Sequence, residues 1–156
     1  VGYLIPEPGQ MHQKYPGFGA FEQAASGTGI AARGRLALQG TRSEGELAHL
    51  TGEEVFNAAR AGEPWAKQIA AETSEYLAQA ISNIALIIDP DVILLGGGVS
   101  RSADLLLEPI RELVNNVVPA PPKIAISRLG YRGAVLGGVA LMVRSTSRYV
   151  SVFRYE

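Results

Sequence analysis

The sequence has 156 residues, of which 47% are hydrophobic and 19% charged, a balance typical of one folded globular unit rather than a disordered or fibrous chain. Fourteen basic residues oppose fifteen acidic ones without any run of Lys or Arg, so we expect no direct binding of nucleic acid. The absence of cysteine excludes disulfides, thiolate zinc sites and a cysteine nucleophile, and it agrees with the cytoplasmic location that we expect.

The first part of the chain combines a short apolar run with many residues that break regular structure. Residues 1–5 are predicted to be a strand already under way at Val1, and the chain is interpreted as a piece of a longer one. Repeated Pro and Gly residues then predict a loop. Between residues 21 and 39, an Ala- and Leu-rich segment predicts two short helices that meet near Ser26, with Ser26 or Thr28 capping the second.

Two further helices are predicted in the central part of the chain. Thr51 and Glu54 match a capping box, in which each side chain satisfies a free backbone donor, and they predict a helix that ends near Ala61. From Pro64 onward, apolar residues recur at helical spacing up to Ile88, which predicts a long core helix. No apolar stretch approaches the roughly 18 residues of a membrane span, so no membrane segment is expected.

The second half of the chain alternates strands and helices. Residues 92–95 form a continuous apolar run, which predicts a central parallel strand buried on both faces. Residues 102–118 predict an amphipathic helix, and residues 123–127 alternate as a strand. A final helix over 134–143 is predicted to pack closely through its small residues. This order implies crossover units and an α/β fold.

Three consecutive glycines, Gly96, Gly97 and Gly98, stand where the predicted buried strand ends and a helix is about to begin. Glycine permits positive φ and close approach by a ligand, and a helix N-terminus favours anionic groups. Ligands in open α/β sheets bind at the carboxyl ends of strands. The spacing alone leaves two interpretations open, a ligand-binding loop and a tight strand-to-helix turn.

Three segments, in order, resemble the ROK family of bacterial sugar kinases and sugar-responsive repressors. Residues 89–100 resemble its C-terminal signature, and residues 18–27 resemble its Gly-Cys-Leu-Glu segment followed by Ala-Ser-Gly. Residues 129–138 resemble the start of its last helix. The resemblance covers nearly the whole chain and implies an incomplete actin-like ATPase, ribonuclease H-like fold with parallel central strands and packed helices.

The resemblance also implies a division of the chain and two kinds of contact. It implies a C-terminal portion with a sugar-binding loop at 1–27, a helical part at 28–88 and an adenosine-side α/β part at 89–156. Glu22 occupies the position that contacts sugar hydroxyls, as a carboxylate can through charge-assisted hydrogen bonds. Without the resemblance, the preferred interpretation of Glu22 is an acid favoured at a helix start. Gly96–Gly98 resemble the loop that lies against the adenosine of ATP.

The sequence departs from the family pattern at its zinc site. Many members bind zinc through one histidine and three cysteines, whereas Tyr3 stands here at the histidine position, and Gly17 and Ala20 offer no ligand either. We therefore expect no structural zinc and leave the role of Tyr3 open. Two alternatives stay open for His12, a sugar contact from its loop or an exposed polar residue. His49 is interpreted as structural or solvated.

Two features could be mistaken for binding elements. Residues 26–30 contain Gly-Thr-Gly beside a helix, but the family places its phosphate loop upstream of this position, so we interpret the segment as a helix kink or cap. Arg33, Arg35 and Arg42 are interpreted as the solvated edge of an amphipathic helix. The aromatic side chains of the long helix, Trp65 and Tyr76, are interpreted as core residues.

The resemblance implies that the parent protein is an ATP-dependent, glucokinase-like sugar kinase that uses ATP with Mg²⁺ and forms a homo-oligomer. This chain alone is predicted inactive, and we assign it no catalytic residue, because no Asp stands in the family's Asn-Asp context. Asp89, Asp91 and Asp104 are interpreted as boundary residues. Two alternatives remain, the effector-binding part of a sugar-responsive repressor and an oligomerisation module.

Overall fold

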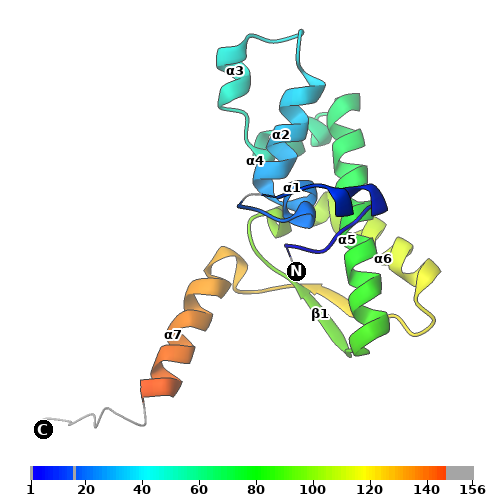
Figure 1. The fold of residues 1–156 in the computed structure, drawn as a ribbon, viewed down its shortest axis with the longest axis vertical. Helices are drawn as coiled ribbons and strands as arrows, with labels where there is room; N and C mark the ends of the chain where they lie inside the picture. Colours follow the sequence, from blue (N-terminus) through cyan, green and yellow to red (C-terminus); the bar gives the residue numbers. More distant parts are fainter. Residues whose placement is uncertain (1, 16, 147–156) are drawn as a thin grey trace, which may run out of the picture.

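The computed structural model describes residues 2–15 and 17–146 as an α/β arrangement in which helices pack on one face of a small sheet (Figure 1). Its α-helices are α1 (Ala20–Ala25), α2 (Gly27–Ala37), α3 (Glu44–Ala48), α4 (Gly52–Arg60), α5 (Pro64–Ile88), α6 (Ala103–Val117) and α7 (Gly133–Thr146). Its strands are β1 (Val92–Leu95) and β2 (Lys123–Ile126), and its 3₁₀ turns are η1 (Pro8–His12), η2 (Val99–Ser102) and η3 (Gly130–Arg132).

The long helix α5 is the centre of the body, as predicted, and α1, α2, α4 and α6 pack against it. It ends at Asp89, whose φ of 51° is left-handed, directly before Pro90, which cannot continue a helix. Side chains from three of the packed helices are completely shielded from solvent: Ile30, Val55, Ile110 and Val114. The apolar core therefore lies between α5 and its neighbours.

The predicted capping box at the start of α4 is confirmed. The Thr51 hydroxyl accepts a hydrogen bond from the Glu54 amide at 3.2 Å, and the Glu54 carboxylate accepts one from the Thr51 amide at 2.7 Å. The bond from the Thr51 amide, together with a second bond that the Thr51 hydroxyl donates to the same carboxylate at 2.8 Å, lowers the pKa of Glu54 below its ordinary value, because both favour the charged carboxylate. The two predicted helices that meet at Ser26 are also confirmed, as α1 and α2.

The two strands pair in parallel, with Val92 opposite Lys123 and Leu95 opposite Ile126, and α6 forms the crossover between them. The predicted burial of β1 on both faces is wrong for the described structure, because Val92 is 46% and Leu94 63% exposed. Successive side chains of a strand point to opposite faces. Ile93 and Leu95 pack against the core, so the described helices cover only one face of the sheet.

The predicted strand at the beginning of the chain is not observed. Val1 lies outside the described residues, and residues 2–5 form a turn followed by irregular backbone. The carbonyls of Gly2 and Leu4 accept hydrogen bonds from the amides of Glu22 and Phe21, each at 3.1 Å. A strand would need these carbonyls to bond to a neighbouring strand. They bond instead to the first turn of α1.

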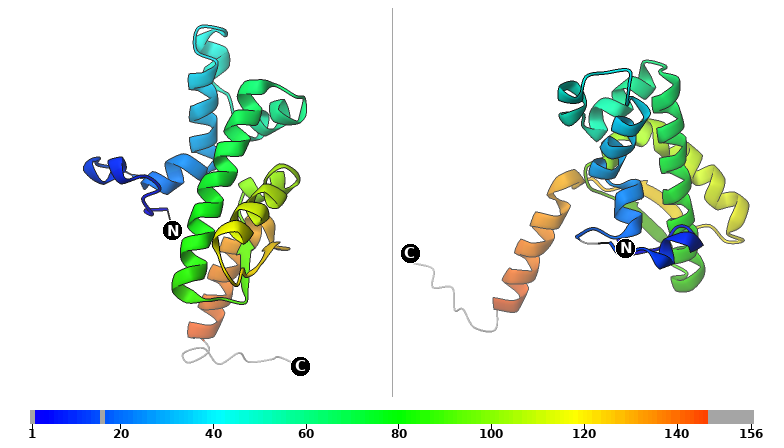
Figure 2. Two further views of the ribbon diagram at one scale, coloured as in Figure 1. Left: turned by 90° about the vertical axis from the view of Figure 1, so that its right-hand side faces the viewer. Right: turned by 45° about the horizontal axis from the view of Figure 1, so that its top comes forward.

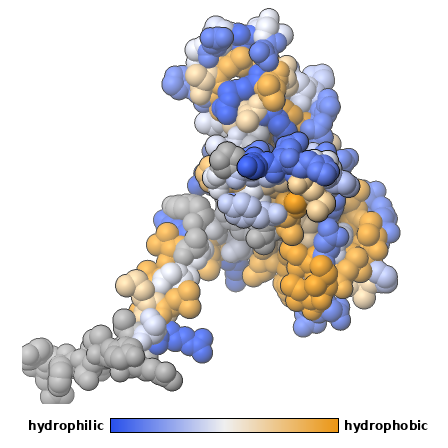
Figure 3. Space-filling view, in the orientation of Figure 1, coloured by the Kyte–Doolittle hydropathy of each residue, from blue (hydrophilic) through white to orange (hydrophobic). Residues whose placement is uncertain are grey.

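The last helix, α7, is confirmed as an element, but it projects away from the body (Figures 1 and 2). The predicted close packing at Gly137 and Gly138 is wrong, since no described atom lies within 4 Å of where either side chain would begin. Apolar side chains gather along this helix and near the end of α5 (Figure 3). The exposed ones are Leu86, Ile87 and Ile88 on α5, and Val135, Leu136, Val139, Leu141, Met142 and Val143 on α7. None of the helices in the described ranges is long and apolar enough to cross a membrane.

Candidate functional site

The glycine loop follows β1 directly and leads into η2 and α6. Gly97 has a φ of 83°, a left-handed conformation in which a side chain would be strained. The space beside Gly97 and Gly98 is open, with no described atom within 4 Å of where a Cβ would lie. The Ser100 hydroxyl donates a hydrogen bond to the Gly97 carbonyl at 2.7 Å. The loop is thus fixed on one side and accessible on the other.

A cavity of about 150 Å³ lies where this loop meets the starts of two helices. Segments far apart in the sequence line it together: Gly27 at the start of α2; Gly52, Glu53 and Phe56 in α4; and Gly98, Val99, Arg101 and Ser102. Free amide groups at helix starts carry partial positive charge and favour anionic groups. The cavity therefore combines an approachable loop, an aromatic wall and two helix N-termini.

The charged side chains at this cavity face each other. An Arg101 Nη1 lies 3.8 Å from a Glu53 carboxylate oxygen, and the two side chains are 61% and 70% exposed. Such an exposed pair is screened by solvent and is easily rearranged. In the described ranges, no three His, Asp or Glu side chains gather in a way that could hold a metal ion.

Glu22, the predicted sugar contact, lies half-buried in the first turn of α1. Its amide donates to the Gly2 carbonyl, and one carboxylate oxygen lies 2.8 Å from where a side chain on Gly2 would begin. This position is compatible with both interpretations of Glu22, the sugar contact and the acid at a helix start.

The junction between α1 and α2 connects the two predicted contacts. Glu22 lies on α1, the Ser26 hydroxyl caps α2 by accepting from the Gly29 amide at 3.2 Å, and Gly27 lines the cavity beside Gly98. The predicted cap is confirmed, yet the same segment also reaches the cavity beside the glycine loop. The structure therefore places the helix that carries Glu22 next to the cavity of the glycine loop.

Sequence reasoning missed the contribution of α2 and α4 to this cavity. Ser26-Gly27 and Thr51-Gly52 are the same local pattern, a hydroxyl cap followed by glycine at the first helical position. Both glycines line the cavity. The repeated pattern was the available signal, because a Cβ at Gly52 would lie 2.7 Å from the Gly27 carbonyl oxygen, and glycine there lets the two helix starts pack against each other beside the loop.

The family model of the ROK family matches residues 2–145 of this sequence. The chain belongs to the ROK family. It is 37% identical over 135 residues to a glucokinase from Halalkalibacterium halodurans, covering 77% of this chain and 39% of the relative.

Two solved ROK structures share the fold. A glucokinase from Streptomyces griseus, solved in complex with glucose and AMPPNP, matches at TM-score 0.67 and 24% identity over 79% of this chain and 44% of its own. A hexokinase from Thermus thermophilus matches at TM-score 0.67 and 24% identity over 92% and 48%. The predicted α/β, actin-like ATPase fold is thereby confirmed, and the chain spans less than half the length of each of these relatives.

Tyr3, which stands at the histidine position of the family pattern, makes a local contact, whereas both histidines of the chain are exposed. The Tyr3 hydroxyl donates to the Gly17 carbonyl at 3.0 Å and so closes the loop between them. His12 lies exposed in η1, and His49 is exposed at the end of α3. The two alternatives for His12, a sugar contact and an exposed polar residue, both stay open.

The interpretation of Arg33 as part of a solvated edge is wrong. Its side chain is only 20% exposed and makes hydrogen bonds to three residues of α1 and α5. Arg35 donates to the Leu50 carbonyl at 3.1 Å, whereas Arg42 is exposed. Among the aromatic residues, Trp65 packs against the core as predicted, but Tyr76 lies half-buried beneath Arg33, outside the core cluster.

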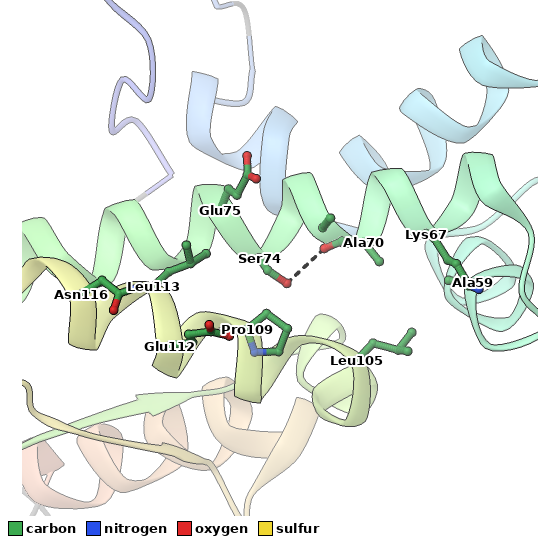
Figure 4. A pocket seen from close by; sticks show the side chains of 11 residues that line it. Ala59, Lys67, Ala70, Ser74, Glu75, Leu105, Pro109, Glu112, Leu113 and Asn116 are labelled. Atoms are coloured by element: carbon green, nitrogen blue, oxygen red, sulfur yellow. Dashed lines mark hydrogen bonds between the residues drawn. The ribbon is translucent and has the colours of Figure 1, made fainter.

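A larger groove of about 430 Å³ runs between α5 and α6 (Figure 4). Its walls are mostly apolar, including Ala70, Leu105, Pro109 and Leu113. The Ser74 hydroxyl at its floor donates to the Ala70 carbonyl of its own helix at 3.1 Å. None of the predicted site residues lines this groove.

Proposed function

We propose that this chain is the portion of an ATP-dependent, glucokinase-like sugar kinase that contacts the sugar and the adenosine. The observation that carries the proposal is the α1–α2 junction, which places the helix of Glu22 beside the cavity lined by Gly98. A kinase must hold a sugar and a nucleotide next to each other, and this geometry supports that arrangement. Membership of the ROK family and the similarity to glucokinases support the same proposal.

In the proposed reaction, a sugar hydroxyl attacks the γ-phosphorus of ATP. A P–O bond to the sugar forms, the bond to the β,γ-bridging oxygen breaks, and a carboxylate accepts the hydroxyl proton. Glu22 would accept hydrogen bonds from sugar hydroxyls and orient the sugar. The backbone of Gly96–Gly98 would let the adenosine approach, while the helix starts at Gly27 and Gly52 would favour the negative charge of the phosphates.

The proton acceptor and Mg²⁺ are not assigned to the described residues. Glu53, the carboxylate that lines the cavity beside the glycine loop, faces Arg101. Among the described residues, no three His, Asp or Glu side chains lie close enough together to hold a metal ion. Mg²⁺ in kinases is bound largely by substrate phosphates with one or two carboxylates. We therefore propose that Mg²⁺ arrives bound to the triphosphate. We also propose that the chain alone does not catalyse the transfer and that the whole enzyme is cytoplasmic.

Calorimetric titration of the whole protein with glucose and with AMPPNP tests the proposal. We expect Glu22→Gln to weaken glucose binding without affecting AMPPNP, and Gly97→Val to weaken AMPPNP without affecting glucose. Glu44→Gln, a change to an exposed acid in the first turn of α3, is the matched control and should alter neither.

The outcomes of the titration separate the alternatives. Sugar binding without nucleotide binding would identify an effector-binding protein of the repressor type instead of a kinase. Binding of neither ligand would overturn the proposal. Kinase turnover by the isolated 156-residue chain, in a coupled assay, would contradict its predicted incompleteness.

A further inference from the structure

A half-buried arginine joins three helices behind the predicted sugar site. Arg33 extends from α2, and its Nη1 donates to the Glu72 carboxylate of α5 at 3.1 Å. Its Nη2 donates to the Ala24 carbonyl of α1 at 2.8 Å and to the Thr73 hydroxyl of α5. Hydrogen bonds from a charged donor are stronger than neutral ones, above all away from solvent. Arg33 therefore fixes α1, α2 and α5 relative to one another.

The bond to Ala24 anchors the far end of the short helix that carries Glu22. The last carbonyls of any helix lack partners within the helix, and α1 has only six residues. Ala24 lies two residues after Glu22. In addition, a side chain at Gly29 would overlap the backbone of Gln23, so α1 and α2 are in direct contact there. This end of α1 is consequently held by both packing and charge.

Arg33 is also connected, through Tyr76, to the segment that precedes α1. The guanidinium carbon lies 5.8 Å from the centre of the Tyr76 ring, within the range of a cation–π interaction. The Tyr76 hydroxyl donates to the Glu7 carboxylate at 3.0 Å, and the Gln79 side chain donates to the Pro6 carbonyl at 2.8 Å. Burial, together with the bond to Glu7, raises the pKa of Tyr76, so this hydroxyl remains a donor at neutral pH. Residues 6–7 are thus tied to α5.

Glu22 lies between these two anchors. Its amide bonds to the Gly2 carbonyl, a few residues before the tethered Glu7, and Arg33 binds the Ala24 carbonyl in the last turn of its helix. We propose that Arg33 is a positioning residue that sets the placement of the Glu22 carboxylate toward the sugar, directly through α1 and indirectly through Tyr76 and Glu7. This inference rests on the proposed function. Arginine suits the role because its planar fork holds several donors in a fixed geometry, whereas the lysine ammonium is a compact charge on a flexible stem.

The test compares two arginines of the same helix in the whole protein. Arg33→Met removes the anchor, and Arg35→Met is the matched control, because Arg35 also donates to a backbone carbonyl, that of Leu50, but does not reach α1. Glucose and AMPPNP are the probes in calorimetric titration. Misplacing a binding group by a fraction of an ångström weakens recognition, so we expect Arg33→Met to reduce glucose affinity about tenfold or more. AMPPNP affinity should stay within about twofold, and Arg35→Met should change neither affinity by more than that.

A milder variant keeps the inference testable if Arg33→Met does not fold. Tyr76→Phe retains the ring beneath Arg33 and removes only the hydroxyl that holds Glu7. We expect it to reduce glucose affinity about two- to fivefold, in proportion to one hydrogen bond. In steady-state assays both variants should raise the KM for sugar and leave the KM for ATP unchanged.

The failure of this inference differs from the failure of the proposed function. If the unaltered protein binds no sugar, the proposed function fails. If it binds glucose and the folded Arg33 and Tyr76 variants bind glucose equally well, Arg33 has no positioning role. A loss of glucose binding in Arg35→Met as large as in Arg33→Met would show general destabilisation and would also overturn the inference.

Discussion

Helices α6 and α7 are nearly equal in length, with 15 and 14 residues, yet the structure treats them in opposite ways. α6 buries one stripe, Leu106, Ile110 and Val114, against the body and leaves its polar side in solvent. α7 carries apolar residues around its circumference and exposes them. A helix that is apolar on all sides requires cover on more than one side. The apolar stripe of α6 is covered by helices of this chain, whereas no described helix covers the apolar residues of α7.

The largest predicted effect is on the buried stripe of α6. Ile110→Ala leaves a cavity where the side chain is completely shielded, and we expect it to lower the free energy of unfolding by about 2–5 kcal/mol. Leu141→Ala on α7 is the matched control and should stay within about 0.5 kcal/mol. Urea denaturation followed by circular dichroism measures both. Equal losses of unfolding free energy in the two variants would contradict the conclusion that α6 is packed and α7 is exposed.

The next effect concerns the helix starts within the body. Thr51→Ala removes the cap of α4, which buries Val55 and Phe56, and should lower the free energy of unfolding by about 1 kcal/mol. Ser43→Ala removes the same kind of capping box from α3, which buries only Leu47. We expect a smaller loss there, because α3 can open without disturbing the body. Thermal unfolding compares the two, and a larger loss for Ser43→Ala would contradict the prediction.

A smaller effect is predicted for the ion pair that joins α4 to α6. Two Arg60 nitrogens donate to Asp104 at 2.7 Å each, and these bonds hold the pKa of Asp104 below its ordinary value of 3.8. A lowered folded-state pKa means that the pair stabilises the fold above the ordinary pKa and that this contribution is lost as pH falls through the lowered one.

The Asp104 side chain is 54% exposed, so solvent screens the pair, and we expect a coupling of about 0.2–1 kcal/mol at pH 7. A double-mutant cycle with Arg60→Met and Asp104→Asn measures the coupling. Its persistence well below pH 3 would contradict the assignment to the Asp104 carboxylate.

The smallest effect on folding is expected where the exposed apolar surface is largest. Leu141→Lys should change the free energy of unfolding by no more than about 0.5 kcal/mol, since the side chain is 70% exposed. It should nevertheless reduce self-association, because large exposed apolar patches promote contacts between molecules. Light scattering across a concentration series measures the mass. Unchanged self-association would exclude α7 as its origin, and the predicted homo-oligomer would then need another surface.

Local sequence patterns were sufficient for most of the helices and for the glycine loop. The Thr51–Glu54 box, the helical spacing after Pro64 and the apolar run at residues 92–95 each depend on neighbours in sequence. The strand predicted at residues 1–5 failed because a strand also needs a partner, and the backbone found its hydrogen bonds at α1 instead. The prediction that β1 is buried on both faces was wrong for the same reason. The residues of a strand do not determine which other element packs on its second face.

The candidate site was predictable in its positions but not in its assembly. The family pattern identified Glu22 and the glycine loop, whose roles stay predictions. The cavity, by contrast, forms where two helix starts 25 residues apart in sequence, at Gly27 and Gly52, meet the loop. Arg33 was misinterpreted because its partners Glu72 and Thr73 lie 39 and 40 residues away. A charged residue on a helix does not reveal such distant partners.

The parallel pair of β1 and β2 has a consequence for protein engineering. Each strand has four residues, and in the described structure each pairs only with the other. On the outer edge of β2 the Ile124 carbonyl already accepts a hydrogen bond from Arg111 at 2.8 Å, so the outer edge of β1 is the more open of the two. Such edges template the addition of further strands. A designed peptide strand that pairs with one edge would serve as a reporter for split-protein complementation. A proline or a charged residue placed on the same edge would protect the chain against uncontrolled β-assembly during expression.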